Sequence, residues 1–593
     1  MRLIFISIII GCIFCFSYSD ILQDYSTARK LFRSGNKKES IQLLKKISQE
    51  PSEVQDFSLY YLGQLSSVDE SIPIYEELLK FYPNFILSSN LQNVITDYSI
   101  SKDNWNRFGE NELWTIASRY FSLSRWRDSQ KVYSYLLEHY PTTSRKIEAL
   151  YHLGVCSLKL SEFTTANMYL EKVILSKDKS YHHLAKYNKA QVILIHNGAP
   201  LGIIALKELR DTYQKDQKIL EMLLPEMARV YRIMNRYEEA AECYKTLLTL
   251  ITNRYSADEI RYNLARMYYI SGNYQAAGEY FLEITNQVPL SQSFGPASLF
   301  MLTLMPGADP VQNQKINERL YNEFPWSYYG HLSAVRTGKT FRRESVPFSS
   351  ILDIKSINPR VKQFIEMDDY ETASTLLRPE FFKKPFNPPL ALYLIKLYEH
   401  ANDYYKALGI SDLVWKEYEK NGELKRMPVV FWEKCYPRHY WREVSREARK
   451  YGIDPYMMLS LIRQESRFNK EALSRSNAFG LMQLKKTTAD GVAKTLGLKQ
   501  YNLNEPIANI MLGTRYFSDM INKNPKYPHY ALACYNAGPN AAKRWIVSGE
   551  HLSPEEFAET IDYSETQHYV KTIMKNYWNY KEIYQWAFDI EHF

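Results

Sequence analysis

The chain has 593 residues, more than one hydrophobic core usually organises, so we expect several domains or a repeat array. Hydrophobic residues make up 45% of the sequence and charged residues 24%, a balance that excludes extensive disorder. The formal net charge of +8 is mild for this length, and no dense Lys/Arg block accompanies it. We therefore expect no nucleic-acid partner.

The first 19 residues have the pattern of an export signal. Arg2 supplies the positive start, residues 3–16 are an almost unbroken apolar run, and Ser17 and Ser19 suit a cleavage site. No later stretch reaches about 18 uninterrupted apolar residues, so we expect no transmembrane segment and a periplasmic location. The alternative is an outer-membrane lipoprotein attached through Cys12. It is disfavoured because the residues after Cys12 stay apolar.

Residues 20–289 carry a repeat of small and large residues that predicts stacked helix pairs. The first small residue of each pair recurs at steps of 37, 74 and 37, where 74 is twice 37. A second small residue and a large one keep the same steps. These three sets are Ala117, Gly154, Ala228 and Ala265; Ser129, Ala166, Ala240 and Ala277; and Tyr133, Leu170, Tyr244 and Phe281.

The predicted architecture of residues 20–289 is an α-solenoid superhelix that resembles tetratricopeptide repeats. Further repeat units are expected near Ala28 and Gly63, and the slot at residues 191–207 is irregular. The surface of such an array could bind a protein partner or only shape the molecule, and the sequence leaves both readings open.

Residues 290–436 are less regular and are interrupted by prolines, which predicts a helical linker domain. No strand-like alternation persists anywhere in the chain, so the predicted fold class is all-α. The mature chain would keep four widely separated cysteines without metal-type spacing, and we expect no metal and no cofactor.

Residues 437–593 contain the strongest chemical signal. Asp454 and Pro455 form a helix start, and the helix that follows places Glu465 on an apolar stripe with Leu461 and Ile462. A buried carboxyl group holds its proton more tightly than one in water, which suits a general acid. Arg463, Ser466 and Arg467 point away from this stripe and are expected to solvate the helix. The alternative is that Glu465 is a boundary residue paired with an arginine elsewhere.

Four short sequence motifs, one of which contains this acid, occur in a characteristic order. They are Arg463–Phe468 (RQESRF), Gly480–Gln483 (GLMQ), Tyr535–Gly538 (YNAG), and Glu565–Thr566 followed by Tyr569–Val570. Together they resemble the catalytic domain of the soluble lytic murein transglycosylases, which cut the glycan strands of bacterial peptidoglycan. The resemblance implies a lysozyme-like, goose-type α-helical catalytic domain over residues 437–593.

The resemblance also assigns roles to individual residues. It implies that Glu465 is the catalytic acid and that the supporting residues are Gly480, Glu565 and Tyr569. The residues expected to bind the glycan substrate are Ser474, Met482, Gln483, Tyr535 and Asn536. For Tyr535 the alternative is a packing role in the core, since the chain has 48 tyrosines.

The implied reaction cleaves the bond between N-acetylmuramic acid and N-acetylglucosamine without water and leaves a 1,6-anhydro end. One acid suffices because the nucleophile belongs to the substrate, whereas ordinary glycosidases use two carboxylates. Two alternatives stay open: a hydrolytic muramidase of the same fold, and a helical-repeat scaffold whose terminal domain has lost activity.

Overall fold

The structure is a computed structural model that describes residues 20–344, 346–348, 357–383, 386–523, 528–549 and 551–591. Residues 1–19, and with them the predictions of an export signal and of Cys12 lipidation, lie outside the described residues. Within the described ranges, none of the helices combines the length and apolarity that crossing a membrane requires. The all-α prediction is confirmed, with two strands of two residues each as the exception among described residues.

The chain forms two compact units, each built from separate stretches. The first unit is Met1–Trp105, Arg342–Glu447 and Leu461–Gly513, and the second is Asn106–Phe341, Ala448–Ser460 and Thr514–Phe593. The predicted domains are continuous stretches of the chain, whereas both units combine residues from the predicted solenoid, linker and C-terminal domain.

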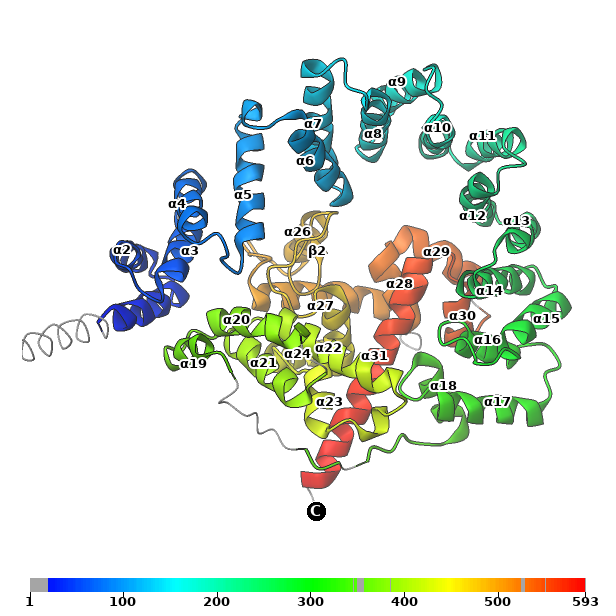
Figure 1. Ribbon diagram of the computed structural model, residues 1–593. Helices are drawn as coiled ribbons and strands as arrows, with labels where there is room; N and C mark the ends of the chain where they lie inside the picture. Colours follow the sequence, from blue (N-terminus) through cyan, green and yellow to red (C-terminus); the bar gives the residue numbers. More distant parts are fainter. Residues whose placement is uncertain are drawn as a thin grey trace, which may run out of the picture. The chain divides into compact units, whose positions relative to one another are not determined.

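The elements up to the linker follow one another as helices (Figure 1). After helical residues 20–33, they are α2 (Lys37–Ser48), α3 (Gln55–Leu65), α4 (Val68–Phe81), α5 (Ser88–Ser101), η1 (Trp105–Arg107), α6 (Glu110–Ser122), α7 (Trp126–His139), α8 (Lys146–Lys159), α9 (Phe163–Ile174), α10 (His182–Asn197), α11 (Ala199–Thr212), α12 (Gln217–Ile233), α13 (Tyr237–Leu250), α14 (Arg254–Ile270) and α15 (Tyr274–Thr285).

The remaining elements include the only strands among the described residues. They are α16 (Gly295–Leu302), α17 (Pro310–Glu323), α18 (Tyr328–Thr337), α19 (Pro359–Glu366), α20 (Tyr370–Lys383), α21 (Pro388–His400), α22 (Tyr404–Lys420), η3 (Leu424–Arg426), α23 (Val429–Cys435), α24 (Trp441–Lys450), α25 (Pro455–Glu465), β1 (Ala478–Phe479), β2 (Leu484–Lys485), α26 (Lys486–Thr495), α27 (Pro506–Ile521), α28 (Pro528–Ala537), α29 (Pro539–Ser548), α30 (Pro554–Thr560) and α31 (Ser564–Glu591).

The predicted repeat is confirmed in the second unit, where consecutive helices from α6 to α15 pack as antiparallel pairs. The small residues of the repeat are buried at the pair contacts, and the large ones fill the gaps beside them. At Gly154 in α8, an added Cβ would stand 2.7 Å from Leu170 Cδ2 in α9. The absence of a side chain at Gly154 therefore sets how closely α8 and α9 approach.

The irregular slot at residues 191–207 proves to be a repeat unit with shifted contacts. The break at Gly198, with φ +91°, ends α10 and starts α11. The close approach is made by Gly202, whose added Cβ would lie 2.8 Å from the backbone Cα of Leu194. The expected small position at residue 191 is a half-buried glutamine, so a search at a strict period of 37 misses this pair.

In the first unit, the N-terminal helices pack on the linker helices through a buried polar cluster. Arg29 and Asp369 form an ion pair of 3.0 Å with side chains that are 0% and 1% exposed. Tyr25 and Thr372 donate hydrogen bonds to the same carboxylate at 2.8 and 2.7 Å, and the Arg29 guanidinium lies over the ring of Tyr61. These contacts join segments more than 300 residues apart in sequence.

Candidate active site

Helix α25 carries the predicted acid and is fixed at its start by Asp454, the predicted N-cap. Asp454 Oδ1 accepts a hydrogen bond of 2.9 Å from the Tyr456 backbone N–H. Its other carboxylate oxygen, Oδ2, is 3.0 Å from both Tyr577 Oη and Lys581 Nζ of α31. The ring of Tyr456 stacks on Tyr580 with a centroid distance of 5.9 Å. One carboxylate therefore starts the helix and ties it to α31.

Glu465 is the last residue of α25, and its side chain is half-buried. The stripe that leads to it is apolar as predicted, because Leu461 and Ile462 are fully buried. The expectation that Arg463 solvates the helix is wrong. Its side chain is only 14% exposed, and it donates to Cys435 O at 3.0 Å and to Asp412 at 2.6 Å.

Asp412 of α22 also pairs with Arg467, at 2.7 Å, so one carboxylate contacts arginines on both sides of the acid in sequence. Arg467 and Phe468 then adopt left-handed backbone conformations, with φ of +54° and +62°. Two non-glycine residues in this region are costly and persist only where the surroundings hold them. The Asp412 ion pairs and the burial of the Phe468 ring against His439 provide that support.

The Gly480–Gln483 motif forms the loop that connects β1 to β2, which pair antiparallel with Phe479 opposite Leu484. The loop is held by Asn509 of α27, a fully buried side chain. Asn509 Nδ2 donates to the carbonyls of Phe479 and Leu503, both at 2.9 Å. Asn509 Oδ1 accepts from the Met482 N–H at 2.8 Å.

The structure explains why residue 480 is a glycine. Its φ is +72°, and an added Cβ would stand 2.3 Å from Asn509 Nδ2 and 2.6 Å from Leu503 O. Met482 is fully buried and packs on Gly513, where an added Cβ would lie 2.4 Å from its Sδ. Packing of the loop therefore requires a glycine at position 480, and Met482 shapes the loop from inside.

Two predicted sugar-binding side chains take part in the turns of this hairpin. Ser474 Oγ accepts from the Ala478 N–H at 3.0 Å and closes the turn before β1. Gln483 has φ +47°, and its Nε2 donates to Ala472 O at 3.2 Å and to Gly480 O at 2.9 Å. These bonds orient the Gln483 amide and direct its oxygen, an acceptor, away from the two carbonyls.

The other predicted residues lie in the second unit, at the end of α28. Tyr535 is half-buried, with its ring centroid 5.4 Å from that of Tyr516 in α27. Asn536 Oδ1 accepts a hydrogen bond of 2.7 Å from Thr566 Oγ1, in the first turn of α31. Gly538, with φ +84°, follows the last residue of α28, and Pro539 starts α29 at once.

Of the two residues predicted to support the site from α31, only Tyr569 is buried, at 4% exposure. Glu565 is exposed in the first turn of the helix. The residue that contacts Asn536 is the neighbouring Thr566, which is 2% exposed. Thr566 belongs to one of the four sequence motifs. Its contact with Asn536 was not predicted, because a threonine at a helix start usually caps that helix.

The two carboxylates nearest to Glu465 in sequence do not supply an obvious second catalytic group. Asp454 is 11 residues away along the same helix, or about 16 Å at 1.5 Å per residue, whereas glycosidase carboxylate pairs lie about 5–10 Å apart. It is also engaged with Lys581. Glu471 is exposed in the loop after α25.

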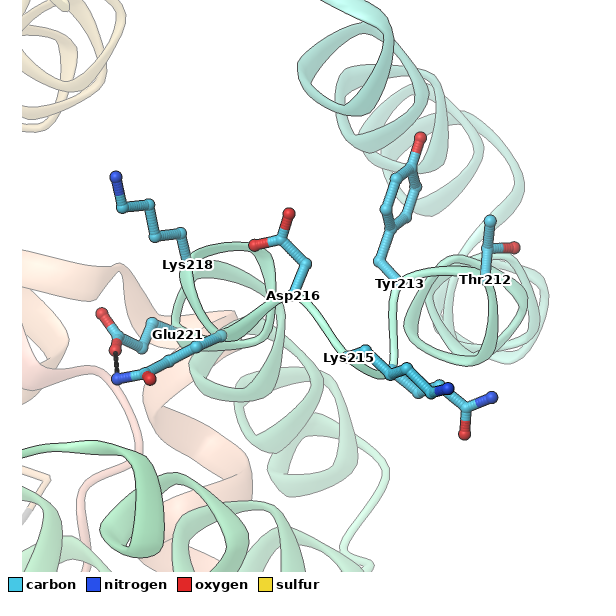
Figure 2. Close-up of a pocket in the computed structure, with 8 residues that line it drawn as sticks. Thr212, Tyr213, Lys215, Asp216, Lys218 and Glu221 are labelled. Carbon is cyan, nitrogen blue, oxygen red and sulfur yellow. Dashed lines mark hydrogen bonds between the residues drawn. The ribbon is translucent and has the colours of Figure 1, made fainter.

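A surface depression of about 790 Å³ lies at the turn between α11 and α12 and contains none of the predicted site residues. Figure 2 shows its side chains spreading outward from the turn. Asp216 caps α12 through the Ile219 N–H, and Gln217 donates to Glu221 and to Leu250 O, both at 2.8 Å. These side chains complete the helix start, and most of them are exposed.

Comparison with known proteins finds two family models that match separate parts of the chain. The family model of the transglycosylase SLT domain matches residues 443–557, and that of a tetratricopeptide repeat matches residues 226–290. A putative soluble lytic murein transglycosylase of Haemophilus influenzae is 33% identical over 143 residues, which are 23% of this chain and 24% of that protein. The soluble lytic murein transglycosylase of Salmonella typhimurium is 32% identical over 147 residues, 24% of this chain and 23% of that protein. The alignments thus span about a quarter of these relatives.

Two solved structures resemble the chain over nearly its whole length. The lytic transglycosylase Slt of Pseudomonas aeruginosa, solved as an inactive mutant, has a TM-score of 0.58 at 16% identity and covers 94% of this chain and 96% of its own. A 70-kDa soluble lytic transglycosylase, solved with bulgecin A, has a TM-score of 0.59 at 14% identity and covers 95% and 97%. The chain therefore has the fold of these soluble lytic transglycosylases, and its residues 443–557 match the model of the transglycosylase SLT domain.

Proposed function

We propose that this protein is an exported peptidoglycan lytic transglycosylase that acts in cell-wall remodelling or turnover in the periplasm. The observation that carries the proposal is the position of Glu465. It ends a helix fixed at both ends, is half-buried, and is followed by a hairpin loop whose backbone is fixed by Asn509. The match of residues 443–557 to the SLT domain supports the same assignment.

In the proposed reaction, protonated Glu465 donates its proton to the glycosidic oxygen between N-acetylmuramic acid and N-acetylglucosamine, and the bond from that oxygen to C1 of the muramoyl residue breaks. The muramoyl 6-hydroxyl oxygen then bonds to C1, and the Glu465 carboxylate accepts the hydroxyl proton. The products are a 1,6-anhydro end and a free 4-hydroxyl. No water is consumed, and Glu465 returns to its starting state.

The remaining predicted residues would position the glycan. Gln483 offers its amide oxygen to a hydroxyl or acetamido N–H, and Asn536, held by Thr566, keeps an N–H₂ group for an acceptor. Tyr535 supplies a half-buried aromatic face at the end of α28. Ser474 and Gly480 would act through the shape of the hairpin loop.

The test is product analysis with the matched variant Glu465→Gln, which keeps the shape of the side chain and removes the transferable proton. We expect the folded variant to lose at least ~10²-fold in the rate of digestion of purified sacculi. The wild-type products should carry anhydro ends, which are lighter by one water than reducing ends. Reducing ends would instead identify a hydrolytic muramidase, and near-normal digestion by Glu465→Gln would remove Glu465 from the reaction.

A further inference from the structure

The segment between α30 and α31 in the second unit is held by residues of the helical repeats. Arg266 of α14 is 4% exposed, and its guanidinium donates from Nε to Glu559 O at 3.0 Å and from Nη2 to Ile561 O at 3.1 Å. Arg232 of α12 donates to the carbonyl of Asp562. Three backbone carbonyls within residues 559–562 are thus bonded to two arginines of the repeat array.

The Glu559 side chain strengthens this attachment because it is buried and its carboxylate is bonded by three polar groups. Its carboxylate accepts from Tyr262 of α14 at 2.6 Å, from Tyr329 of α18 at 2.7 Å and from Lys571 of α31 at 2.7 Å. Burial alone would raise the pKa of Glu559, but the Lys571 ammonium, the Tyr262 hydroxyl and Arg266 together lower it. Buried charge-assisted bonds of this kind are geometrically demanding.

The attached segment leads directly into a residue of the candidate site. Gln567 of α31 donates to Ala558 O and Glu559 O, at 3.1 and 3.0 Å, so the first turn of α31 is tied to the same backbone. The adjacent residue, Thr566, donates its hydroxyl to Asn536 Oδ1 at 2.7 Å. Arg266 and Gln567 thus bind the same carbonyl of Glu559, and the backbone links Gln567 to Thr566, whose hydroxyl bonds to Asn536.

We propose that Arg266 is a positioning residue for the transglycosylase reaction and acts on Asn536 through the 559–566 segment. The helical repeats then have a role inside the catalytic cycle: two of their arginines determine where α31 begins, and this start orients an amide of the glycan-binding set. The inference rests on the proposed function, because it takes Asn536 to contact the substrate.

The test compares full-length Arg266→Ala with Arg261→Ala, a change on the same helix. Arg261 forms ion pairs with Asp258 and Glu283, both within the repeats. We expect Arg266→Ala to lose roughly 10-fold or more in kcat/KM on purified glycan strands, because misplacement by a fraction of an ångström is costly. Arg261→Ala should stay within about twofold of the wild type. Activities are measured well below each variant's unfolding temperature.

A double-mutant cycle distinguishes positioning from general loss of structure. Thr566→Val and Asn536→Ala should lose activity through the same parameter, kcat or KM, as Arg266→Ala. Combining Arg266→Ala with Thr566→Val should cost little more than the larger single loss. If Arg266→Ala does not fold, Arg266→Lys serves instead, since a lysine keeps the charge but cannot bridge two carbonyls with a planar fork.

Full activity of a folded Arg266 variant, or losses that multiply in the double variant, would overturn this inference and leave the proposed function intact. Inactivity of the wild type on all glycans, or full activity of Asn536→Ala, would overturn the proposed assignment of the site, and this inference with it.

Discussion

At the scale of single residues, Asn509 deserves a test because three backbone groups depend on one buried amide. It fixes the carbonyls of Phe479 and Leu503 and the N–H of Met482. A sequence signal for it exists in retrospect. Asn509 is a polar residue on the face of α27 that also carries the fully buried Ile510 and Leu512. Such a residue is retained only where its hydrogen bonds are made.

We predict that Asn509→Leu lowers the free energy of unfolding by at least about 2 kcal/mol, because it leaves buried backbone groups without their partners. The loop should also lose its fixed geometry, so kcat/KM on glycan strands should fall at least roughly 10-fold at temperatures where the protein is folded. Chemical denaturation measures the free energy of unfolding, and the rate of product release from glycan strands measures kcat/KM. Asn504→Leu, at an exposed position five residues earlier, is the control, and equal losses in both variants would contradict the prediction.

At the scale of elements, glycine positions determine how closely the paired helices of the repeats can approach. Gly202 and Gly278 both lie inside helices of the array, but their surroundings differ. An added Cβ at Gly202 would lie 2.6–2.8 Å from atoms of Leu194, one of them backbone, whereas Gly278 has open space. The two glycines thus separate the effect of helix propensity from that of overpacking.

We predict opposite effects from the same substitution at these positions. Gly278→Ala should stabilise the protein by up to about 1 kcal/mol, because alanine is the better helix former. Gly202→Ala gains the same propensity but should be net destabilising, since overpacking costs about 1–3 kcal/mol and the Leu194 backbone cannot move freely. Thermal unfolding of both variants measures the signs, and stabilisation by Gly202→Ala would mean that α10 and α11 have room to separate.

The contact between the N-terminal helices and the linker helices should depend on pH through Asp369. Burial raises the pKa of Asp369, but the charge of Arg29 and hydrogen bonds from Arg29, Thr372 and Tyr25 lower it further, so the net shift is downward. The folded protein therefore binds this proton less tightly than the unfolded chain does. The stabilisation is present above the unfolded value of about 3.9 and is lost as pH falls through the folded pKa.

We expect Asp369→Asn to cost on the order of 3 kcal/mol near pH 7, because it leaves Arg29 buried without its partner. The difference in unfolding temperature between the variant and the wild type should shrink as pH falls toward about 3. Asp368→Asn is the matched control, since Asp368 forms an exposed pair with Lys30 that contributes little. A difference that grows on acidification would contradict the depressed pKa of Asp369.

At the scale of the whole molecule, the chain order of the parts could be predicted but their physical boundaries could not. The repeat period, the Asp454 helix start and the four sequence motifs are local patterns, and these predictions were confirmed. The partners Asp412 and Arg266 lie 51 and more than 200 residues from the groups they hold. No local sequence pattern predicts such a contact, because an arginine or aspartate in the sequence is equally compatible with an ordinary surface position.

These long-range contacts lead to a prediction about an isolated catalytic segment. A fragment of residues 437–593 lacks Asp412, which pairs with Arg463 and Arg467, and lacks the partners of Glu559 in the repeats. We expect the fragment to unfold at a markedly lower temperature than the full chain and to cleave soluble glycan poorly. Full-length protein carrying Glu465→Gln controls for background cleavage, and a stable fragment with full activity would show that the contacts are dispensable.

Tyr262, Arg266 and Tyr269 lie on one face of α14, at spacings of four and three, and contact Glu559, the adjoining backbone and Glu556. The same helix also packs within the repeats, through the buried residues Leu264, Ala265 and Met267. One helix therefore obeys two sequence requirements at once. A chimera that joined this C-terminal segment to the helical repeats of another protein would lack these contacts. Placing the Tyr-x₃-Arg-x₂-Tyr pattern in the corresponding repeat helix of that protein is the smallest change that would restore them.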